Sequence, residues 1–335
     1  MPSSRATSED VARRAGVSQS TVSRVFSNNT RISEATREKV LQAATELEYR
    51  PNTLARSLIT KESRLIGVVM AGIDTAVSPY LLEKLTVRLQ ADGYKVLLFN
   101  AGNALSADEL LPAALDYQVD GLITTSAIVS DEMAQVCARF QTPLVLFNRR
   151  IKNQAVNTVN ADDYAGGQLV ADAMVGAGIQ RPAFISGPQN TSTTQERSRG
   201  FFERLAAHGY TQPIQRIGDL SYDSAFAATC ALLRGDEHPD GIFAASDLMA
   251  LGALDALRYE LGLRVPDDIQ VIGFDDIPSA ARAAYQLTTI RIDFDLMIDH
   301  TLRILQGNLK QAAHPVEQVT TPVSYVERKT LITGL

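Results

Sequence analysis

Residues 7–26 read TSEDVARRAGVSQSTVSRVF, and this stretch decides the fold of the N-terminal region. Apolar residues recur at helical spacing over 11–15 and again over 22–26. Gly16 lies between the two runs and can adopt the left-handed conformation that a tight turn needs. The stretch therefore predicts two short helices joined by a sharp corner, with Val17 packed into the angle between them.

Capping residues mark where these helices begin. Thr7 and Asp10 have capping-box spacing for the first helix, and Ser18 is the expected N-cap of the second. Ser33 is a natural N-cap for a third helix. The apolar stripe of that third helix is Val40, Leu41, Ala44 and Leu47. Three short helices over about fifty residues can enclose one small core.

The second helix presents polar residues on its outer side. Gln19, Ser20 and either Ser23 or Arg24 point away from the side that carries Val22. Glutamine can bond adenine and arginine can bond guanine in the major groove of DNA, and small Ser and Thr side chains let the backbone approach phosphates. The pattern favours a DNA-reading helix. The alternative is an ordinary helical corner with a solvated second helix.

The charge distribution favours DNA binding. The whole chain of 335 residues has a net charge of −6, but residues 1–60 hold nine Arg and Lys against six Asp and Glu, a charge of +3. The remainder therefore carries −9. A basic N-terminal unit on an acidic body is expected when only one part of a protein contacts phosphates.

Composition narrows the class of protein. Hydrophobic residues make up 45% of the chain, which is typical of globular domains, and no apolar run is long enough to span a membrane. The N-terminus lacks the apolar region of a signal peptide, so we expect a cytoplasmic protein. Neither Cys137 nor Cys230 has a second cysteine or a histidine nearby at the spacing of metal ligands, which predicts small buried thiols with neither a disulfide nor a metal site. The sequence shows no cofactor-binding motif.

Beyond residue 63 strand and helix alternate. Buried parallel strands are indicated by short apolar runs at 65–70, 95–99, 121–124, 144–147, 183–186, 241–244 and 271–274. Helices are expected between them, for example over 80–91, 164–175, 224–233 and 248–261. About 270 residues exceed one doubly wound sheet, so the sequence predicts two such sheets, with a first break near 160–162.

Two stretches resemble the headpiece of the LacI/GalR family of bacterial repressors. They are DVARRAGVSQSTVSRVFSNN at 10–29 and ISEATREKVLQAATELEYRPNTLARSL at 32–58. The resemblance implies a headpiece over 1–50, a hinge helix or linker over 51–62, and a homodimer on operator DNA. It implies that paired hinges enter the minor groove and that Leu58 wedges between base pairs. Its DNA-binding residues would be Thr7, Ser18, Gln19, Ser20, Thr21, Arg24, Arg31, Asn52, Ala55 and Leu58. A plain packing role is the alternative for Leu58.

The core over 63–335 is similar to the effector domain of the same family. The motifs are RSRGF at 197–201, ASDLMALGA at 245–253 and GFDDIP at 273–278. The resemblance implies the two-lobed fold of periplasmic sugar-binding proteins. The N-lobe would comprise about 63–161 and 293–322, and the C-lobe about 162–292 and 323–335. An effector would bind between the lobes.

Polar residues follow three of the predicted strands, at the carboxyl ends where parallel sheets bind ligands. Asp275 and Arg197 are the strongest candidates, because a strand-end aspartate and a convergent arginine can orient a ligand, and Tyr80 could stack on a sugar ring or base. The complete expected effector set is Asp74, Tyr80, Asn148, Arg149, Arg197, Ser246, Asp247 and Asp275.

Several polar residues in and beside these motifs have a structural alternative. Asp247 can cap its helix, Asp276 can shape a turn, and Arg199 can be a solvated surface residue. Ser246 stands where the family usually has asparagine, so the usual hydrogen bonds of an amide to a sugar are in doubt there.

Two rival functions share parts of this pattern. An enzyme is disfavoured because Gly-x-Gly-x-x-Gly, a phosphate-binding loop and Gly-x-Ser-x-Gly are absent. A transport-type binding protein would need an export signal, and a basic helix-turn-helix stands in its place. Sequence leaves open whether the effector is an inducer or a corepressor. It favours a sugar or sugar derivative, with a nucleoside or a sugar acid as alternatives.

Overall fold

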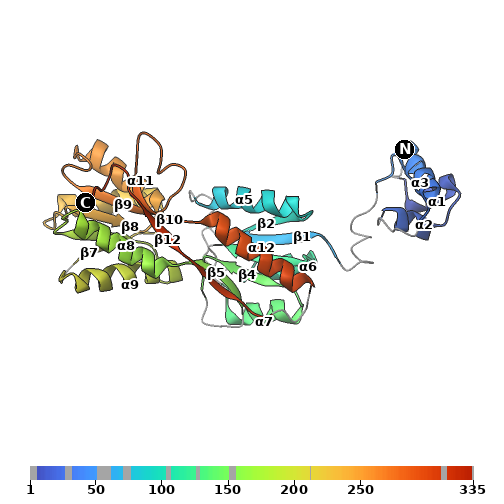
Figure 1. Cartoon of the computed structure of the whole chain (residues 1–335), viewed down its shortest axis with the longest axis horizontal. Coiled ribbons are helices and arrows are strands. Elements are labelled where there is room, and N and C mark those ends of the chain that lie inside the picture. Colours follow the sequence, from blue (N-terminus) through green and yellow to red (C-terminus); the bar gives the residue numbers. More distant parts are fainter. Residues whose placement is uncertain are drawn as a thin grey trace. The chain divides into compact units, whose positions relative to one another are not determined.

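The computed structural model describes residues 6–26, 32–50, 62–70, 77–102, 107–125, 129–150, 156–211, 213–310 and 315–333. The chain divides into two compact units, Met1–Ser63 and Arg64–Leu335. The expected DNA-binding residues Arg31, Asn52, Ala55 and Leu58 and the expected effector residue Asp74 lie outside the described residues. In Figure 1 the smaller unit is drawn in blue and the larger one in cyan to red.

The small unit contains the three predicted helices, α1 (Ser8–Ala15), α2 (Gln19–Phe26) and α3 (Glu34–Glu46). The capping box is confirmed, because Thr7 Oγ1 accepts from Asp10 N while the Asp10 carboxylate accepts from Thr7 N. Gly16 has a φ of 67° and ends α1 in the predicted left-handed conformation. Ser18 and Ser33 accept hydrogen bonds from Thr21 N and Thr36 N, as expected of N-caps.

The core of the small unit differs from the prediction at one position of α3. Leu41 is 43% exposed, and Ala43 is buried in its place. Three helices this short enclose little volume, so a small side chain fits where the helices approach each other. The buried set is Val11, Ala12, Val22, Val25, Val40, Ala43 and Ala44.

The large unit contains two six-stranded sheets, which confirms the predicted pair of doubly wound α/β lobes. The sheet of the N-lobe has the order β11-β5-β4-β3-β1-β2, and all its neighbouring strands are parallel. Its strands are β1 (Leu65–Met70), β2 (Lys95–Asn100), β3 (Gly121–Thr125), β4 (Leu144–Phe147), β5 (Asn157–Ala161) and β11 (Gln318–Thr321). Its helices are α5 (Val77–Ala91), α6 (Leu111–Asp116), α7 (Asp131–Arg139) and α12 (Phe294–Lys310).

The sheet of the C-lobe has the order β12-β10-β9-β8-β6-β7, with β12 antiparallel to β10. Its strands are β6 (Pro182–Ser186), β7 (Ile214–Ile217), β8 (Gly241–Ala244), β9 (Gln270–Asp275), β10 (Thr288–Ile292) and β12 (Val323–Val326). Its helices are α8 (Asp163–Gly176), α9 (Ser192–Ala207), α10 (Tyr222–Arg234) and α11 (Asp247–Asp255), and a π-helix at Ala256–Glu260 continues α11.

Alternation along each strand divides the N-lobe core between two faces. Val68 packs with α5 and α12, whereas the next residue, Val69, packs with α6 and α7. Cys137 is buried on the second of these faces, and burial raises the pKa of its thiol to about 11. Cys230 is also buried and free, as the cysteine spacing predicts.

Three crossings join the lobes, and Figure 1 shows them running between the two sheets. β5 leads through Asp162 into α8, β10 leads through Asp293 into α12, and β11 leads through Pro322 into β12. Asp162 N donates to Thr321 O at 2.9 Å, so the first and third crossings lie side by side. Because β5 and β10 leave their own sheets at their carboxyl ends, those ends of the two sheets face each other.

The prediction missed β5, β7, β10, β11 and β12, whose sequences are NTVNA, IQRI, TTIRI, QVTT and VSYV. These strands carry threonine, asparagine, glutamine, serine or arginine between their apolar residues in place of a continuous apolar run. Three of them, β7, β11 and β12, lie at sheet edges and are partly solvent-exposed. The other two, β5 and β10, lie beside the crossings, where polar residues such as Asn157 and Thr321 form hydrogen bonds between segments.

Helices α8 and α9 pack closely because each has a glycine at the contact. A Cβ on Gly200 would lie 2.0 Å from Tyr164 O, and one on Gly167 would lie 2.3 Å from Arg197 O. Both distances are far below van der Waals contact with backbone atoms that cannot turn aside. The glycines therefore bring α9, and Arg197 with it, against the first turn of α8.

We expect Gly200→Ala to lower the free energy of unfolding by about 2 kcal/mol, because the added methyl group forces α8 and α9 apart. Gly176→Ala is the matched control on α8, since its Cβ would meet only Thr333 Cγ2 at 3.7 Å. That control should leave stability unchanged or raise it by about 0.5–1 kcal/mol, as alanine favours helix over glycine. Urea unfolding of both variants measures the difference, and equal midpoints would contradict the close-packing argument.

Candidate functional site

The strongest candidate site in the large unit is a buried ion cluster around Arg197. Arg197 Nε donates to Asp163 Oδ1 at 2.8 Å, and Nη2 donates to Asp275 Oδ1 at 3.2 Å. Nη1 donates to the carbonyl oxygen of Ala245 at 2.5 Å. All three nitrogens of the guanidinium are therefore bonded within the protein. Arg197 thus fixes two carboxylates in position, and the hydrogen-bond donors that were expected to orient a ligand already have partners in the protein.

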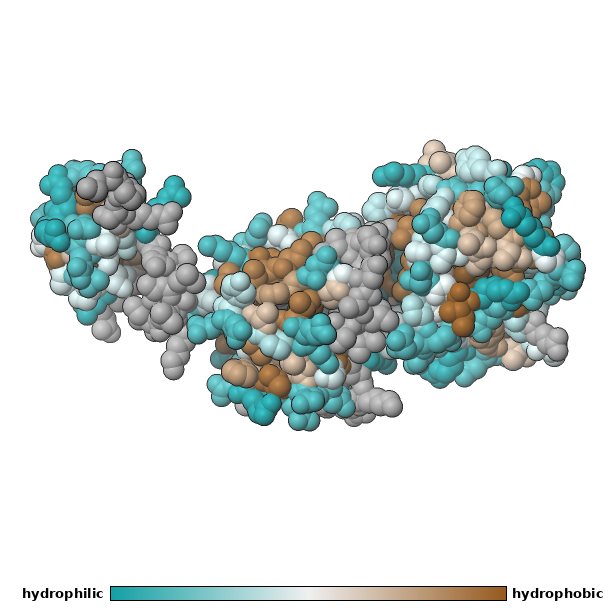
Figure 2. All heavy atoms as spheres, turned by 180° about the vertical axis from the view of Figure 1, so that it is seen from behind, coloured by the Kyte–Doolittle hydropathy of each residue, from teal (hydrophilic) through white to brown (hydrophobic). Residues whose placement is uncertain are grey.

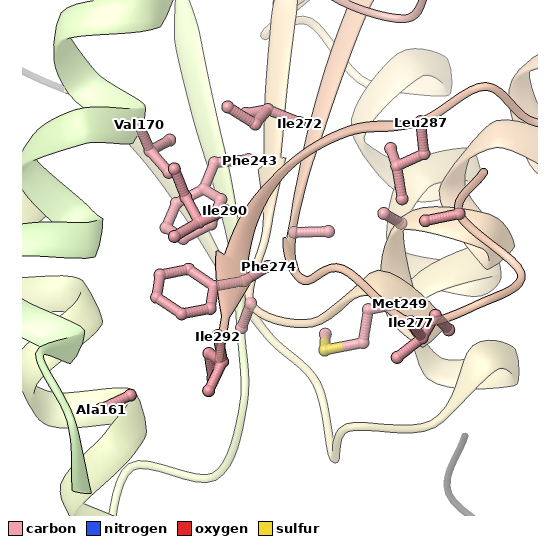
Figure 3. Close-up of a cluster of buried hydrophobic side chains, with 14 of the residues drawn as sticks. Ala161, Val170, Phe243, Met249, Ile272, Phe274, Ile277, Leu287, Ile290 and Ile292 are labelled. Carbon is pink, nitrogen blue, oxygen red and sulfur yellow. The ribbon is translucent and has the colours of Figure 1, made fainter. Parts of the chain in front are cut away.

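Elements from four parts of the C-lobe build this cluster. Asp163 is the first residue of α8, Arg197 lies in α9, Ala245 follows β8, and Asp275 ends β9. The guanidinium carbon of Arg197 lies 3.7 Å from the centroid of the Phe274 ring, a cation–π contact. Figure 3 shows Phe274 between Ile290 and Ile292 of β10 and near Ala161, so the ring joins the hydrophobic core to the charged site.

Burial shapes the titration of the cluster. Burial raises the pKa of the Asp275 carboxyl to about 6, although Arg197 acts in the opposite direction. Burial raises the pKa of Asp163 as well, again against the effect of Arg197. Burial alone would lower the pKa of Arg197, but the two carboxylates outweigh it and raise that pKa. The guanidinium therefore remains charged, and the pKa of about 6 means that Asp275 gains a proton in mildly acidic solution.

The backbone at Asp275 is unusual, with a φ of 117°, and Asp276 has a φ of 57°. The φ of Asp276 lies in the left-handed region that aspartate tolerates better than most residues, whereas the φ of Asp275 lies outside it. Asp276 lies between two cations, because its oxygens accept from Arg291 Nε and Arg328 Nη2, each at 2.6 Å. These two bonds hold the turn that Asp276 was expected to shape, and they orient the end of β9.

The N-lobe contributes Asn148 and Arg149, which follow β4. Arg149 Nη1 donates to the carbonyl oxygen of Asn148 at 2.8 Å and to Thr193 Oγ1 on α9 at 3.3 Å. Thr193 is one helical turn before Arg197, so Arg149 meets the C-lobe beside the ion cluster. The structure thus brings together Arg149, Arg197 and Asp275 from the predicted set. We refer to Asn148, Arg149, Asp163, Thr193, Arg197 and Asp275 as the interlobe site.

Asp247 belongs to the interior of the C-lobe. Its Oδ1 accepts from Thr289 Oγ1 at 2.5 Å and its Oδ2 accepts from Ile277 N at 2.9 Å, and the side chain is fully buried. The protein thus engages both carboxylate oxygens, which supports a structural role for Asp247, and its contact with an effector stays a prediction. The capping alternative is wrong, because Ser246 is the N-cap of α11 and its Oγ accepts from Met249 N at 3.4 Å.

Two further expected residues have contacts within their own lobe. The ring of Tyr80 packs edge-on against Phe294 with centroids 6.2 Å apart, and Lys84 Nζ lies 5.0 Å from the Tyr80 centroid. Arg199 is exposed, bonds to Glu196 at 2.6 Å and lies over the Tyr164 ring, as expected of a surface residue. Neither set of contacts reaches the ion cluster.

Sequence reasoning missed Asp163 and Thr193. A signal for Asp163 was present in the pair Asp162-Asp163 at the start of a helix, where only the first is needed as an N-cap. Asp162 Oδ1 indeed accepts from Ala165 N at 3.0 Å, which leaves Asp163 for Arg197. Thr193 had no such signal, because its role depends on a contact between lobes.

A small pocket lies at the crossings beside the cluster, and its lining includes Arg150, Asn160, Asp163 and Ser192. The larger pocket lies at the amino ends of β6 and β7, between Pro182 and Ile214. We place the site at the crossings, because parallel sheets bind ligands at carboxyl strand ends. The described residues include no cluster of His, Cys, Asp or Glu suited to a metal ion. No helix among them is long and apolar enough to cross a membrane.

The small unit presents the outer side of α2 to solvent. Gln19, Ser20, Ser23 and Arg24 are exposed, while Val22 and Val25 are buried. Gln19 Nε2 donates to Ser8 Oγ at 2.9 Å, which ties the start of α2 to α1. The hydroxyls of Ser18, Ser20 and Thr21 form a chain with 2.9 Å spacings, and the Thr7 hydroxyl donates to Asp10. The arrangement is a helix-turn-helix with an accessible second helix.

Comparison with known proteins shows which family the chain belongs to. A family model described as "Bacterial regulatory proteins, lacI family" matches residues 7–52, and one described as "Periplasmic binding protein-like domain" matches residues 171–331. The chain is 33% identical over 325 residues to the HTH-type transcriptional regulator CelR of Thermobifida fusca, and the alignment covers 94% of this chain and 95% of CelR.

Two solved structures match nearly the whole chain. The lac repressor dimer bound to operator and the anti-inducer ONPF superimposes with a TM-score of 0.87 at 31% identity and covers 98% of this chain and 99% of that one. The CelR–cellobiose complex has a TM-score of 0.73 at 30% identity and covers 97% and 100%. The chain therefore belongs to the LacI family of bacterial regulatory proteins and is a DNA-binding transcriptional regulator.

Proposed function

We propose that this regulator is a repressor that binds operator DNA as a homodimer and that a small polyhydroxylated effector, a sugar or sugar derivative, binds at the interlobe site. The observation that carries the proposal is the Arg197 cluster, where the buried carboxylates of Asp163, at the start of α8, and Asp275, at the end of β9, act electrostatically on Arg149 of the N-lobe. Carboxylate oxygens accept hydrogen bonds from hydroxyl groups, which suits a polyol. The cellobiose in the CelR complex supports a sugar as the ligand class.

Control of DNA binding follows from the position of the site between the lobes. A ligand that bonds to Asp275 on the C-lobe and to Asn148 on the N-lobe favours one arrangement of the lobes over another. Such a ligand shifts the equilibrium only by the difference between its affinities for the two arrangements. In this proposal the regulator acts through binding alone, without catalysis, and works in the cytoplasm, where bacterial operator DNA lies.

The headpiece reads the operator through α2 in this proposal. Gln19, Ser20 and Arg24 contact base edges, and Thr7, Ser18 and Thr21 lie at the phosphate backbone. The expected hinge contacts through Asn52, Ala55 and Leu58, and the expected contact of Arg31, extend this interface. The +3 charge of residues 1–60 supplies the sequence-independent part of the affinity.

Apolar surface on the N-lobe supports the homodimer. Figure 2 shows brown, apolar side chains gathered on one face of this lobe. β2 is an edge strand, and Leu98 on β2, Val87 on α5 and Tyr117 beside Phe99 are all exposed. Exposed apolar side chains around an unpaired edge favour aggregation unless a partner covers them. We assign that cover to a second copy, in agreement with the lac repressor dimer.

Gln19→Ala should weaken binding to the cognate operator by about 1–3 kcal/mol and relax the preference at one base pair, because a bidentate contact to a base edge is lost. Binding to random DNA should change far less, since phosphates dominate there. Gln42→Ala on α3 is the control, as Gln42 is exposed and bonds to Glu46. Fluorescence anisotropy with both DNAs measures the effect. An equal loss on both would exclude base reading by Gln19.

Asp275→Asn and Arg197→Ala should both weaken effector binding at least tenfold, because the first changes a carboxylate acceptor and the second releases both carboxylates from their positions. A thermal-stability panel of metabolites identifies the ligand, and calorimetry then measures its affinity. Arg199→Ala, two residues further along α9, is the control and should bind normally. Full-strength binding in both site variants would place the effector elsewhere.

Operator assays on Arg197→Ala separate two kinds of regulation. If the ligand is an inducer, the variant should stay on the operator at every ligand concentration. If the ligand is a corepressor, the variant should fail to bind the operator at any ligand concentration.

Leu98→Asp should dissociate the homodimer, because a charge would be buried against the partner. Phe140→Asp, an equally drastic change at another exposed N-lobe position, is the control. Sedimentation equilibrium measures the oligomeric state, and gel shifts on a near-palindromic operator should show that the monomer binds weakly. A dimeric Leu98→Asp protein would exclude this surface.

A further inference from the structure

Arg149 has a buried positive charge that forms no ion pair with any residue that the structure describes. The side chain is only 6% exposed. Its two acceptors, the carbonyl oxygen of Asn148 and the hydroxyl of Thr193, are neutral, and both bond to Nη1. Its Nε is buried and has no hydrogen-bond partner among the described residues. One edge of the guanidinium therefore has donors that remain unused.

The neighbouring carboxylates do not fill this need. Burial lowers the pKa of Arg149 to about 10. The negative charges of Asp163 and Asp275 act in the opposite direction but do not outweigh burial. Their close bonds go to Arg197, at 2.8 Å and 3.2 Å. Arg149 forms no ion pair within 4.0 Å among the described residues. It remains charged at neutral pH, in surroundings where a buried charge is unfavourable unless a counter-charge lies beside it.

A second unsatisfied group lies next to it. Asn148 Oδ1 is buried and accepts no hydrogen bond from the described residues. Asn148 has a φ of 56°, a conformation that asparagine tolerates better than most residues. A buried carbonyl oxygen without a donor and a buried N–H without an acceptor, on consecutive residues at a strand end, together indicate a ligand that offers both.

We propose that Arg149 binds a carboxylate of the effector through its Nε edge and that Asn148 Oδ1 accepts from a hydroxyl of the same molecule, so that the effector is a hydroxy acid of the sugar-acid class. The inference rests on the proposed effector site and names its ligand chemistry. A carboxylate matches the fork of two N–H donors on one guanidinium edge. The doubly charged phosphate group fits less well, because the carboxylates of Asp163 and Asp275 lie close by and repel it.

Arg149 also connects ligand binding to the lobes. Its backbone belongs to the N-lobe, whereas its Nη1 bonds to Thr193 of the C-lobe. A carboxylate on the Nε edge fixes the guanidinium plane and with it the contact to α9. The acid group thus stabilises the arrangement of the lobes in which this contact is made.

The test compares acids with neutral sugars of the same shape. Thermal midpoints and calorimetric affinities are measured with gluconate against glucitol, glucuronate against glucose, and galacturonate against galactose. The wild-type protein should bind one of the acids at least tenfold more tightly than its neutral partner. Arg149→Gln should lose this preference by about 10- to 100-fold, because it removes a charged hydrogen-bonding pair. Arg149→Lys keeps the charge but not the fork, and it should retain part of the preference.

Controls separate the proposal from simpler effects. Arg139→Gln removes the same charge from an exposed position on α7 and should leave the preference unchanged. Without ligand, Arg149→Gln should be as stable as the wild type, because an unpaired buried charge is removed with its hydrogen bonds. A lower midpoint with the acid preference intact would show a purely structural role and overturn the proposal.

The remaining outcomes distinguish ligand class from site. The proposal is overturned if none of the acids raises the thermal midpoint of the wild-type protein. It is also overturned if glucose 6-phosphate binds tightly while glucuronate has no effect. A third outcome is that a neutral sugar binds to the wild type and equally well to Arg149→Gln, while Asp275→Asn abolishes its binding. That result would refute the sugar-acid assignment but leave the proposed effector site in place. If an acid binds but neither Arg149→Gln nor Asp275→Asn weakens it, both the acid assignment and the site fail.

Discussion

The bond of the Arg197 guanidinium to Asp163 and Asp275 is the interaction on which the interlobe site depends. It joins the start of α8, the middle of α9 and the end of β9 in a region without solvent. Removing one partner from such a cluster leaves an uncompensated buried charge and costs about 3–5 kcal/mol. The packing of Gly167 and Gly200 makes the bond possible, because bulkier residues would hold α9 too far from Asp163.

The two sides of the site differ in how far their polar groups are satisfied. On the C-lobe, Arg197 has a partner for every nitrogen, and Asp247 has one for each oxygen. On the N-lobe, Asn148 Oδ1 and Arg149 Nε are buried and have no hydrogen-bond partner in the part of the chain that the structure describes. The hydrogen-bonded cluster around Arg197 therefore lies beside two N-lobe residues with unmade bonds. A ligand that completes those bonds adds binding free energy to the arrangement in which the lobes make this contact. Coupling to DNA binding requires such a difference in binding free energy between the arrangements of the lobes.

The sequence predicted the features that depend on a few neighbouring residues. The capping box of Thr7 and Asp10, the left-handed Gly16 and the apolar strands follow from local chemistry, and all are observed. Features that depend on tertiary contact were missed. Asp247 resembles a ligand residue until Thr289, 42 positions away, is placed beside it. Strand β5, with two asparagines, and strand β10, with two threonines, lack an apolar run, and elements far away in the sequence satisfy polar side chains such as Asn157 and Thr288.

The satisfied and unsatisfied groups have different roles in specificity. A side chain whose hydrogen bonds are all made within the protein stabilises the fold and presents nearly the same surface to every ligand. A buried group with an unmade bond discriminates strongly, because a ligand that fails to complete it leaves the desolvation of that group uncompensated. In the effector site that we propose, Arg197 and Asp163 therefore set the geometry, whereas Asn148 and Arg149 select the ligand. On this proposal, the unpaired polar atoms of these two residues, among those that the structure describes, determine which effector binds.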